Sequence, residues 1–363
     1  LLSQCMRSDM ASSRQFNFET LAEFDDHRMV SFIYDSARRL RGFIALHRSG
    51  RRRESFGATR LWRYGAPIDA LKDALRLSRL MSYKSAMAGL PYGGAKGVLM
   101  DTSGTPRERA RLIEEYARRV NGLGGSFITG TDAGMSMRDV LVMRRVTPYV
   151  VGVRANPTRF TAFGLFSSLK VCLKEIGAQG SCAGQHIAVQ GLGKIGFELV
   201  GLLYASGARI TACDIDVHRV RAAGRRFPKI SFVAPEKIYE QKCDVFSPCA
   251  LGGVLTRRTV KKLKTAAIVG GANNQLGDED AGDALWRAGI LYAPDYVVNA
   301  GGLISVVDEL QHPRIDEAKI ERRVARIAET LRAVLDESRR TKTAPHRVAD
   351  AMAETRMESW NEQ

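Results

Sequence analysis

The segment HIAVQGLGKIGFELVGLLYASGARITACDID, residues 186–216, constrains the fold of this chain more than any other stretch. It contains a short apolar run, three glycines in the spacing G-x-G-x-x-G, a helical stretch and a second apolar run. This order predicts two parallel strands joined by a crossover helix. Because helices cover both faces of a parallel sheet, the segment predicts an α/β fold with a Rossmann-type, doubly wound sheet.

The glycines of this segment predict a turn that binds phosphate. Gly191 permits a tight turn, Gly193 lets a pyrophosphate approach the backbone, and Gly196 brings the helix close to the strand. The backbone N–H groups at the start of the helix then bind the phosphates. The motif follows an apolar strand and precedes a helix, so its context favours a bound dinucleotide over a βαβ unit without one.

The residue at the end of the second apolar run indicates which dinucleotide binds. Asp214 would accept hydrogen bonds from a ribose 2′-hydroxyl and repel a 2′-phosphate, which favours NAD over NADP. His218 and Arg219 follow closely enough to leave strict preference open. The predicted coenzyme contacts of this segment are Gln190, Gly191, Leu192, Gly193, Lys194, Ile195, Gly196 and Asp214.

The length of the chain predicts two domains. Its 363 residues suffice for two domains of ordinary size. In the first, residues 1–150, we predict a β-hairpin over 28–47 and helices over 67–89 and 106–122. In the second, residues 151–330, short apolar strands alternate with helical segments, as in a parallel sheet.

The end of the chain predicts two charged helices. They span residues 316–340 and 344–359, and we expect the C-terminal helix, within 340–363, to pack back on the first domain. Apolar runs are broken long before the roughly 20 residues that a bilayer requires. The first residues lack the charged and apolar pattern of a secretory signal. We therefore expect no membrane segment and a cytoplasmic location.

The net charge of +16 raises the hypothesis of a nucleic-acid partner. The positive residues are spread over several helical stretches that also carry acidic residues, and no nucleic-acid-binding signature accompanies them. We expect general attraction to polyanions and no specific nucleic-acid partner. The six cysteines form neither a CxxC pair nor a regular framework, so we predict reduced thiols and no metal site.

A lysine surrounded by glycines is the candidate for catalysis. Lys96 lies in LPYGGAKGVLM, where close backbone approach and apolar neighbours could remove water and lower its pKa. Lys84, shortly before it, could face the same cleft and bind a carboxylate, and Asp132 in ITGTDAG ends a predicted strand. These residues fit chemistry at an amine beside a carboxylate. Solvated surface lysines remain the alternative on this pattern alone.

Nine ordered segments resemble one enzyme family over nearly the whole chain. They are GATRLW, DALRLSRLMSYKSAMAGL, GGAKG, ITGTDAG, NPTRFTAFG, VQGLGKIG, DVFSPCALGG, GGANNQL and YAPDYVVNAGGLI. They are similar to segments of the Glu/Leu/Phe/Val dehydrogenases, and within them of the leucine and phenylalanine dehydrogenase branch. The resemblance implies reversible oxidative deamination, in which an L-amino acid, NAD and water give a 2-oxo acid, ammonium and NADH. It also implies a homo-oligomer and a first domain that binds substrate and drives assembly.

The resemblance implies roles for the candidate residues. Lys96 matches the lysine that activates water, Lys84 the lysine that holds the α-carboxylate, and Asp132 the acid that relays a proton. Asn274 matches an asparagine near the nicotinamide and the substrate. Thr161 matches a threonine that contacts the nicotinamide amide.

The remaining candidates concern the coenzyme and the amino-acid side chain. Asn299 is expected on the coenzyme side of the cleft. Phe56 stands where the glutamate branch carries a lysine, and because a buried dicarboxylate without a cation is costly, we expect an apolar substrate. The candidate contacts of the substrate side chain are Phe56, Gly57, Gly130, Leu303 and Val306. The resemblance implies more room at Gly130 than in leucine enzymes, where alanine is common, which favours phenylalanine or another aromatic substrate and leaves leucine open.

Two departures from the family pattern support an alternative. The arginine-rich segment 48–55 is longer than usual, and Arg159 and Phe160 replace small residues and a proline. Together with the net charge, they leave open a catalytically weakened nucleotide-binding protein with nucleic-acid affinity. Retention of Lys84, Lys96 and Asp132 favours the active enzyme.

Overall fold

The computed structural model describes residues 18–100, 104–278 and 280–360, which fold around two β-sheets. The first sheet is mixed, with strand order β1-β2-β4-β3-β5, and β4 lies at its centre between antiparallel β2 and parallel β3. Its strands are β1 (Met29–Asp35), β2 (Leu40–Leu46), β3 (Ser55–Trp62), β4 (Gly93–Met100) and β5 (Phe127–Ile128). The predicted hairpin over 28–47 is confirmed by the antiparallel pair β1 and β2.

Three α-helices of the first half pack beside this sheet. They are α1 (Pro67–Met87), α2 (Pro106–Gly122) and α3 (Met137–Arg144), and a short 3₁₀ helix spans Phe18–Thr20. Helix α2 has the predicted bounds, because Thr105 caps its start and Pro106 is tolerated in the first turn. Helix α1 ends before the predicted residue 89, since Gly89 adopts a left-handed conformation with φ +67°.

The second sheet is parallel throughout, with strand order β11-β10-β9-β6-β7-β8. This is the Rossmann order, in which the first strand of the unit, β6, lies centrally, so the predicted fold class is confirmed. The strands are β6 (His186–Gln190), β7 (Arg209–Cys213), β8 (Ser231–Phe232), β9 (Lys242–Pro248), β10 (Lys264–Ile268) and β11 (Leu291–Tyr292).

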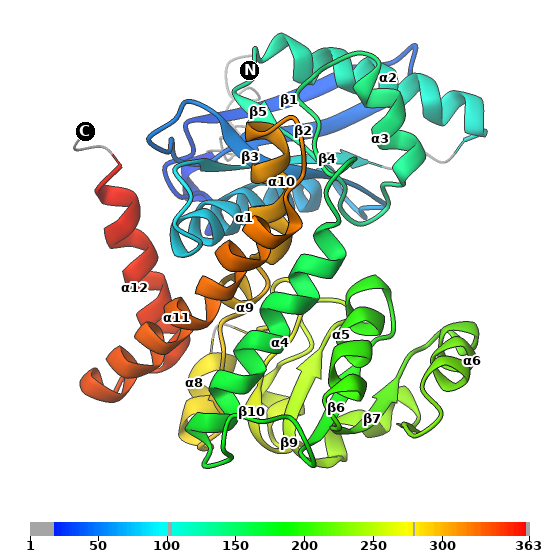
Figure 1. Ribbon diagram of the computed structural model, residues 1–363. Coiled ribbons are helices and arrows are strands. Elements are labelled where there is room, and N and C mark those ends of the chain that lie inside the picture. The colour runs from blue at the N-terminus through cyan, green and yellow to red at the C-terminus, as the bar shows by residue number, and fades with distance from the viewer. Residues whose placement is uncertain (1–17, 101–103, 279, 361–363) are drawn as a thin grey trace, which may run out of the picture.

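Helices of the second half surround this sheet and return to the first one. They are α4 (Pro157–Glu175), α5 (Lys194–Ala205), α6 (Val217–Arg226), η2 (Pro235–Glu240), α7 (Arg257–Val260), α8 (Ala281–Arg287), α9 (Asp295–Val298), α10 (Gly301–Gln311), α11 (Glu317–Thr341) and α12 (Pro345–Glu358). Figure 1 shows the first sheet above the second, with α4 running down beside the lower layer and α12 at the edge of the molecule.

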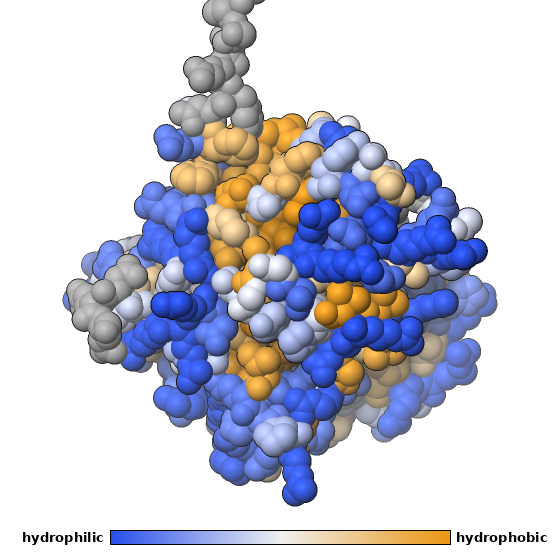
Figure 2. Space-filling view, turned by 90° about the horizontal axis from the view of Figure 1, so that it is seen from above, coloured by the Kyte–Doolittle hydropathy of each residue, from blue (hydrophilic) through white to orange (hydrophobic). Residues whose placement is uncertain are grey.

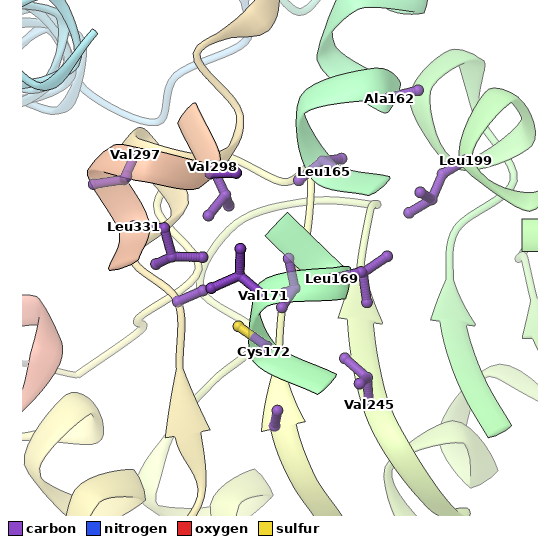
Figure 3. Packing of buried hydrophobic residues seen from close by; sticks show 14 of the residues in the cluster. Ala162, Leu165, Leu169, Val171, Cys172, Leu199, Val245, Val297, Val298 and Leu331 are labelled. Carbon is purple, nitrogen blue, oxygen red and sulfur yellow. The ribbon is translucent and has the colours of Figure 1, made fainter. Parts of the chain in front are cut away.

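The core of the second half centres on α4. Figure 3 shows its apolar side chains facing β9, α5, α9 and α11. The labelled members are Ala162, Leu165, Leu169, Val171, Cys172, Leu199, Val245, Val297, Val298 and Leu331. Each large side chain of this kind contributes about 1.5–3 kcal/mol when fully buried.

Two late helices connect the halves of the chain. Buried residues of α10 join Phe56 and Ile128 of the first sheet in one apolar cluster, and α12 packs against α1. Because these helices leave the second half and contact the first, the division at about residue 150 stays a proposal. Among the described residues, no helix has the length and apolar character needed to cross a membrane, and no group of acidic, histidine or cysteine side chains could hold a metal ion.

Candidate active site

A cleft of about 220 Å³ lies between the two sheets. Lys96 of β4, Lys84 in the last turn of α1 and Asp132 after β5 all line it. The ε-ammonium Nζ of Lys96 donates to Oδ2 of Asp132 over 2.6 Å, and Lys96 is only 5% exposed. Lys96 occupies the central strand of its sheet, which is why water is excluded around it. Three candidate residues from separate segments therefore meet in one cavity.

The glycines around Lys96 allow neighbouring elements to pack closely on β4. A Cβ on Gly94 would lie 2.2 Å from backbone atoms of Ser78 and Ser82 in α1, and a Cβ on Gly97 would lie 2.0 Å from Oη of Tyr116. The predicted close approach of backbone is thus present at Gly94, and at Gly97 the approaching group is a side chain. Both glycines let the neighbouring helix α1 and the Tyr116 ring pack directly on β4.

Burial dominates the electrostatics of Lys96 and its partner. Burial lowers the pKa of Lys96, the Asp132 carboxylate opposes this, and the Arg60 guanidinium adds to the lowering. The two cations hold the pKa of Asp132 well below its usual range although burial opposes them. Asp132 is therefore a fixed anion, and Lys96 loses its proton more readily than a solvated lysine does.

Arg60 is a cleft residue that the sequence reasoning missed. Its Nε donates to Oδ2 of Asp132 over 3.0 Å, and its other end donates to Asp73 over 2.7 Å. A signal was present, because Arg60 lies in GATRLW two residues after Ala58, the residue paired with Lys96 in parallel β3. Alternate strand residues share a face, so residue 60 points to the same side as Lys96.

Lys84 lies at the opposite wall of the cleft. Its Nζ donates to Oδ1 of Asn273 over 3.0 Å, and Asn299 donates to the same oxygen over 3.1 Å. Burial lowers the pKa of Lys84 to about 8, with Asp295 opposing this and Lys96 reinforcing it. Lys84 is half-buried and keeps part of its surface exposed, so an incoming carboxylate can reach its side chain.

Two residues near Lys84, Asn273 and Asp295, were not predicted. Asn274 lines the cleft as expected, but it is the neighbouring Asn273 that contacts Lys84. The backbone N–H of Asn274, which has φ +54°, donates to the buried carboxylate of Asp295 over 2.5 Å. Burial raises the pKa of Asp295, and Lys84 opposes this. Asp295 lies in YAPDYVV, a quoted motif from which no role was assigned.

The predicted pocket for the substrate side chain needs one correction. Gly57, Gly130, Leu303 and Val306 line the cleft. Phe56 does not line it: the ring is fully buried and lies edge-on to Tyr92 at 4.7 Å. The Phe56 ring packs instead in an apolar cluster with Tyr92 and Leu303. Residues of the wall that the sequence reasoning missed are Val151, Gly152 and Pro157.

The glycine turn fits a dinucleotide. Gly191 has φ +96°, and a Cβ on Gly196 would lie 2.0 Å from the carbonyl oxygen of Gly191, so both positions require glycine. Next to Gly193, which precedes α5, only the tip of Arg219 comes within 4 Å of a Cβ position. No side chain caps this helix start, which leaves its N–H groups for a phosphate.

Further coenzyme candidates lie around this turn and in the cleft. Oδ2 of Asp214 accepts from the backbone N–H of Leu192 over 2.7 Å, and Arg219 approaches the same oxygen at 3.6 Å. Lys194 begins α5, and the side chain of Gln190 donates to Tyr239 over 2.7 Å. The candidates that line the cleft itself are Thr161, Ile195, Asn274 and Asn299. The turn and the cleft are thus continuous through Ile195.

A larger hollow of about 1330 Å³ lies elsewhere, at the opposite edge of the second sheet. It is lined by the first residues of parallel strands, among them His186, Lys242 and Lys264. Ligands of open α/β sheets bind at the carboxyl ends of the strands, which is where the glycine turn lies. The smaller cleft, with its paired Lys96 and Asp132, is therefore the candidate active site.

Comparisons with known proteins agree with this geometry. Residues 28–149 match the family model "Glu/Leu/Phe/Val dehydrogenase, dimerisation domain", and residues 215–362 match "Glutamate/Leucine/Phenylalanine/Valine dehydrogenase". Leucine dehydrogenase of Bacillus cereus is 37% identical, covering 94% of this chain and 93% of its own length. Phenylalanine dehydrogenase of Bacillus thermotolerans is 35% identical, and the match covers 87% of this chain and 84% of the relative's own length.

A solved structure gives the same result. L-tryptophan dehydrogenase from Nostoc punctiforme superimposes with a TM-score of 0.79 at 35% identity, covering 93% of this chain and 98% of that one. The similarity thus spans both sheets and the cleft between them. The chain belongs to the Glu/Leu/Phe/Val dehydrogenase family, in its leucine and phenylalanine dehydrogenase branch, and is an amino-acid dehydrogenase that uses a nicotinamide coenzyme.

Proposed function

We propose that this enzyme catalyses the NAD-dependent, reversible oxidative deamination of a hydrophobic L-amino acid of the phenylalanine or leucine type. The observation that supports it is a buried Lys96, paired with Asp132, in one cleft with Lys84 and the end of the glycine turn. The nicotinamide coenzyme, when bound, accepts a hydride from the α-carbon of the amino acid. The nucleic-acid alternative is not supported, since Lys84, Lys96 and Asp132 all line one cleft.

Each side chain then has a chemical task. Protonated Lys84 binds the α-carboxylate, which replaces its contact with Asn273. Neutral Lys96 accepts a proton from the water that attacks the imino carbon, because burial disfavours its charged form. Asp132, held as an anion by Arg60, keeps the amine of Lys96 in place and stabilises the ammonium that forms when this amine accepts the proton.

The pocket supports an apolar substrate of variable size. Val151, Leu303 and Val306 supply apolar surface to the cleft. Of the cations in its lining, Arg60 and Lys96 bind Asp132, and Lys84 is assigned to the α-carboxylate, so none is left for a side-chain carboxylate. A Cβ on Gly130 would lie 3.3 Å from the carbonyl oxygen of Val151, so alanine there would narrow the pocket. One methyl group changes selectivity by about 1–3 kcal/mol. The relatives that act on leucine, phenylalanine and tryptophan support the same substrate class.

The coenzyme preference rests on Asp214. Its carboxylate lies beside the glycine turn, where it repels a 2′-phosphate, although Arg219 reduces this repulsion. We therefore propose NAD as the better coenzyme. A homo-oligomer and a cytoplasmic location complete the proposal; the match to a dimerisation domain supports the first, and the second stays a prediction from the sequence.

The test is a panel of amino acids with NAD and with NADP at mildly alkaline pH. We expect NADH formation with L-phenylalanine, L-leucine or L-tryptophan and little with L-glutamate. Lys96→Ala should lower kcat by about 10²–10⁴-fold, the usual contribution of a general base. Lys262→Ala, which removes an exposed lysine, is the matched control and should keep full activity. No turnover of any hydrophobic amino acid by the folded wild-type enzyme would exclude the proposal.

A further inference from the structure

The segment 151–155 is the first crossing of the chain between the two sheets, and one buried carboxylate holds it. Glu309 of α10 is 2% exposed. Its Oε2 accepts from the backbone N–H groups of Gly152 over 3.1 Å and Ala155 over 2.9 Å. Its Oε1 accepts from the N–H of Val153 over 3.2 Å. Three backbone donors of the crossing thus converge on a single side chain.

A side chain of the crossing in turn donates hydrogen bonds to α10. The guanidinium of Arg154 donates to the backbone carbonyls of Glu309 and Pro313, and to that of His312 over 3.2 Å. These carbonyls lie at the C-terminal end of α10 and just after it, where a helix leaves acceptors unpaired. Segment 151–155 and α10 are therefore tied together by bonds in both directions.

Both partners of this contact form the wall of the substrate pocket. Val151 and Gly152 begin the crossing, and Leu303 and Val306 lie on α10 before Glu309. A Cβ added to Gly152 would lie 3.9 Å from Cγ1 of Val306, so the two walls face each other closely there. The distance between crossing and helix consequently sets the width of the pocket that receives the substrate side chain.

Joining two segments through a buried carboxylate that binds only backbone groups requires a large desolvation free energy. Removing a charged group from water is costly unless its hydrogen bonds are replaced, and charge-assisted bonds to N–H groups are stronger and shorter than neutral ones. An apolar contact would join α10 to the crossing without fixing its position. The carboxylate specifies position, because all three N–H groups must point at its two oxygens.

We propose that Glu309 is a positioning residue that sets substrate selectivity, by fixing the crossing 151–155 against α10 and so the width of the side-chain pocket. The proposal rests on the hydrophobic amino-acid specificity proposed above. Glu309 does not line the cleft, and its effect reaches the substrate through Val151 and Gly152.

The experiment measures kcat/KM for L-leucine and L-phenylalanine with the full-length enzyme. Glu309→Gln keeps the size of the side chain but leaves it one acceptor oxygen, whereas the three N–H groups of the crossing bind two oxygens in the wild type. We expect the ratio of the two kcat/KM values to move toward unity by about 5-fold or more, within the range that small pocket changes produce. Because a ratio cancels the fraction of active enzyme, a merely structural loss would leave it unchanged.

Asp308→Asn is the matched control. Asp308 is equally buried on the same helix, but its carboxylate accepts from Arg323 of α11 over 2.9 Å and does not bind the crossing. The ratio of the two kcat/KM values in Asp308→Asn should therefore equal that of the wild type. NADH affinity should stay the same in both variants. A ratio in Glu309→Gln within 2-fold of the wild type would overturn the proposal, as would an equal change in Asp308→Asn.

Two further results keep the test decisive. If Glu309→Gln fails to fold, Arg154→Gln takes its place, because it removes the hydrogen bonds of the exposed Arg154 guanidinium to the carbonyls at the end of α10. The ratio of the two kcat/KM values in Arg154→Gln then supports or overturns the proposal. If the wild-type enzyme turns over neither amino acid, the proposed function fails, whereas an active wild type with an unchanged ratio in the variant removes only the role of Glu309.

Discussion

At the scale of single residues, the catalytic cleft depends on how charges are buried. Lys96 and Lys84 both have a pKa below the usual lysine value, since burial is the largest influence on each. Their proposed tasks are opposite, because Lys96 must lose its proton and Lys84 must keep one to bind a carboxylate. The enzyme therefore works in the pH range where both conditions hold.

The charge of Lys84 gives a pH prediction. Its pKa of about 8 means that the free enzyme loses this cation as the pH rises above 8, so affinity for a carboxylate falls there. We expect the Kd of 4-methyl-2-oxopentanoate, which has no amino group to titrate, to rise about tenfold per pH unit above that value. Isothermal titration between pH 6 and 10 measures this dependence.

Lys84→Arg provides the control for that titration. A guanidinium stays protonated throughout this range, so the Kd of the variant should be independent of pH even if binding is weaker. A variant that kept the wild-type dependence would show that another group titrates.

Residues of the site differ in how far the sequence predicted them. Lys84, Lys96, Asp132 and Gly130 carry local signals, and the structure brings all of them to the cleft. Arg60 and Asp295 were missed because their partners lie on other segments, and such pairings arise only on folding. Phe56 does not reach the cleft because its ring packs against Tyr92 and in a cluster with Leu303, which lie on segments distant in the chain.

At the scale of elements, close packing of β4 against α1 fixes the position of Lys96. A Cβ on Gly94 cannot fit against the α1 backbone without moving one element. Gly94→Ala should therefore lower the free energy of unfolding by about 1–3 kcal/mol, the usual cost of overpacking. Urea denaturation followed by circular dichroism measures the change.

A second glycine of the same domain serves as the comparison. Gly122 is the last residue of α2 and has nothing within 4 Å of its Cβ position. Gly122→Ala should be neutral or raise the free energy of unfolding by about 0.5–1 kcal/mol, because alanine loses less backbone entropy in a helix. Equal destabilisation by both substitutions would contradict the packing role assigned to Gly94.

At the scale of the whole molecule, one face of the first sheet carries apolar residues in contact with solvent. Figure 2 shows apolar side chains gathered at this end of the molecule. Phe32 and Tyr34 of the edge strand β1 are 53% and 59% exposed, and their rings stack at 6.1 Å. Exposed apolar residues on an edge strand are a liability unless a partner covers them.

The assembly predicted for this enzyme can be tested at that strand. Phe32→Glu with Tyr34→Glu should shift the wild-type oligomer to a smaller species, because charges would be buried in the contact. Size-exclusion chromatography with light scattering gives the mass. Trp286→Glu, which changes an exposed aromatic residue of α8, should leave the mass unchanged. An identical mass for all three proteins would place the interface elsewhere.

The sequence by itself determined the α/β class, the parallel sheet with its glycine turn, and the positions of the β1–β2 hairpin and of helices such as α1, α2, α11 and α12, because periodicity, helix caps and glycine conformations are local properties of the chain. Tertiary structure alone decided which glycines face helices, that the Phe56 ring packs against Tyr92 outside the cleft lining, and that Arg60 and Glu309 contact residues distant in the sequence. Those contacts depend on sheet register and on the return of α10 and α12 to the first sheet. Burial then sets the pKa of each lysine, and burial exists only once the two halves have packed together.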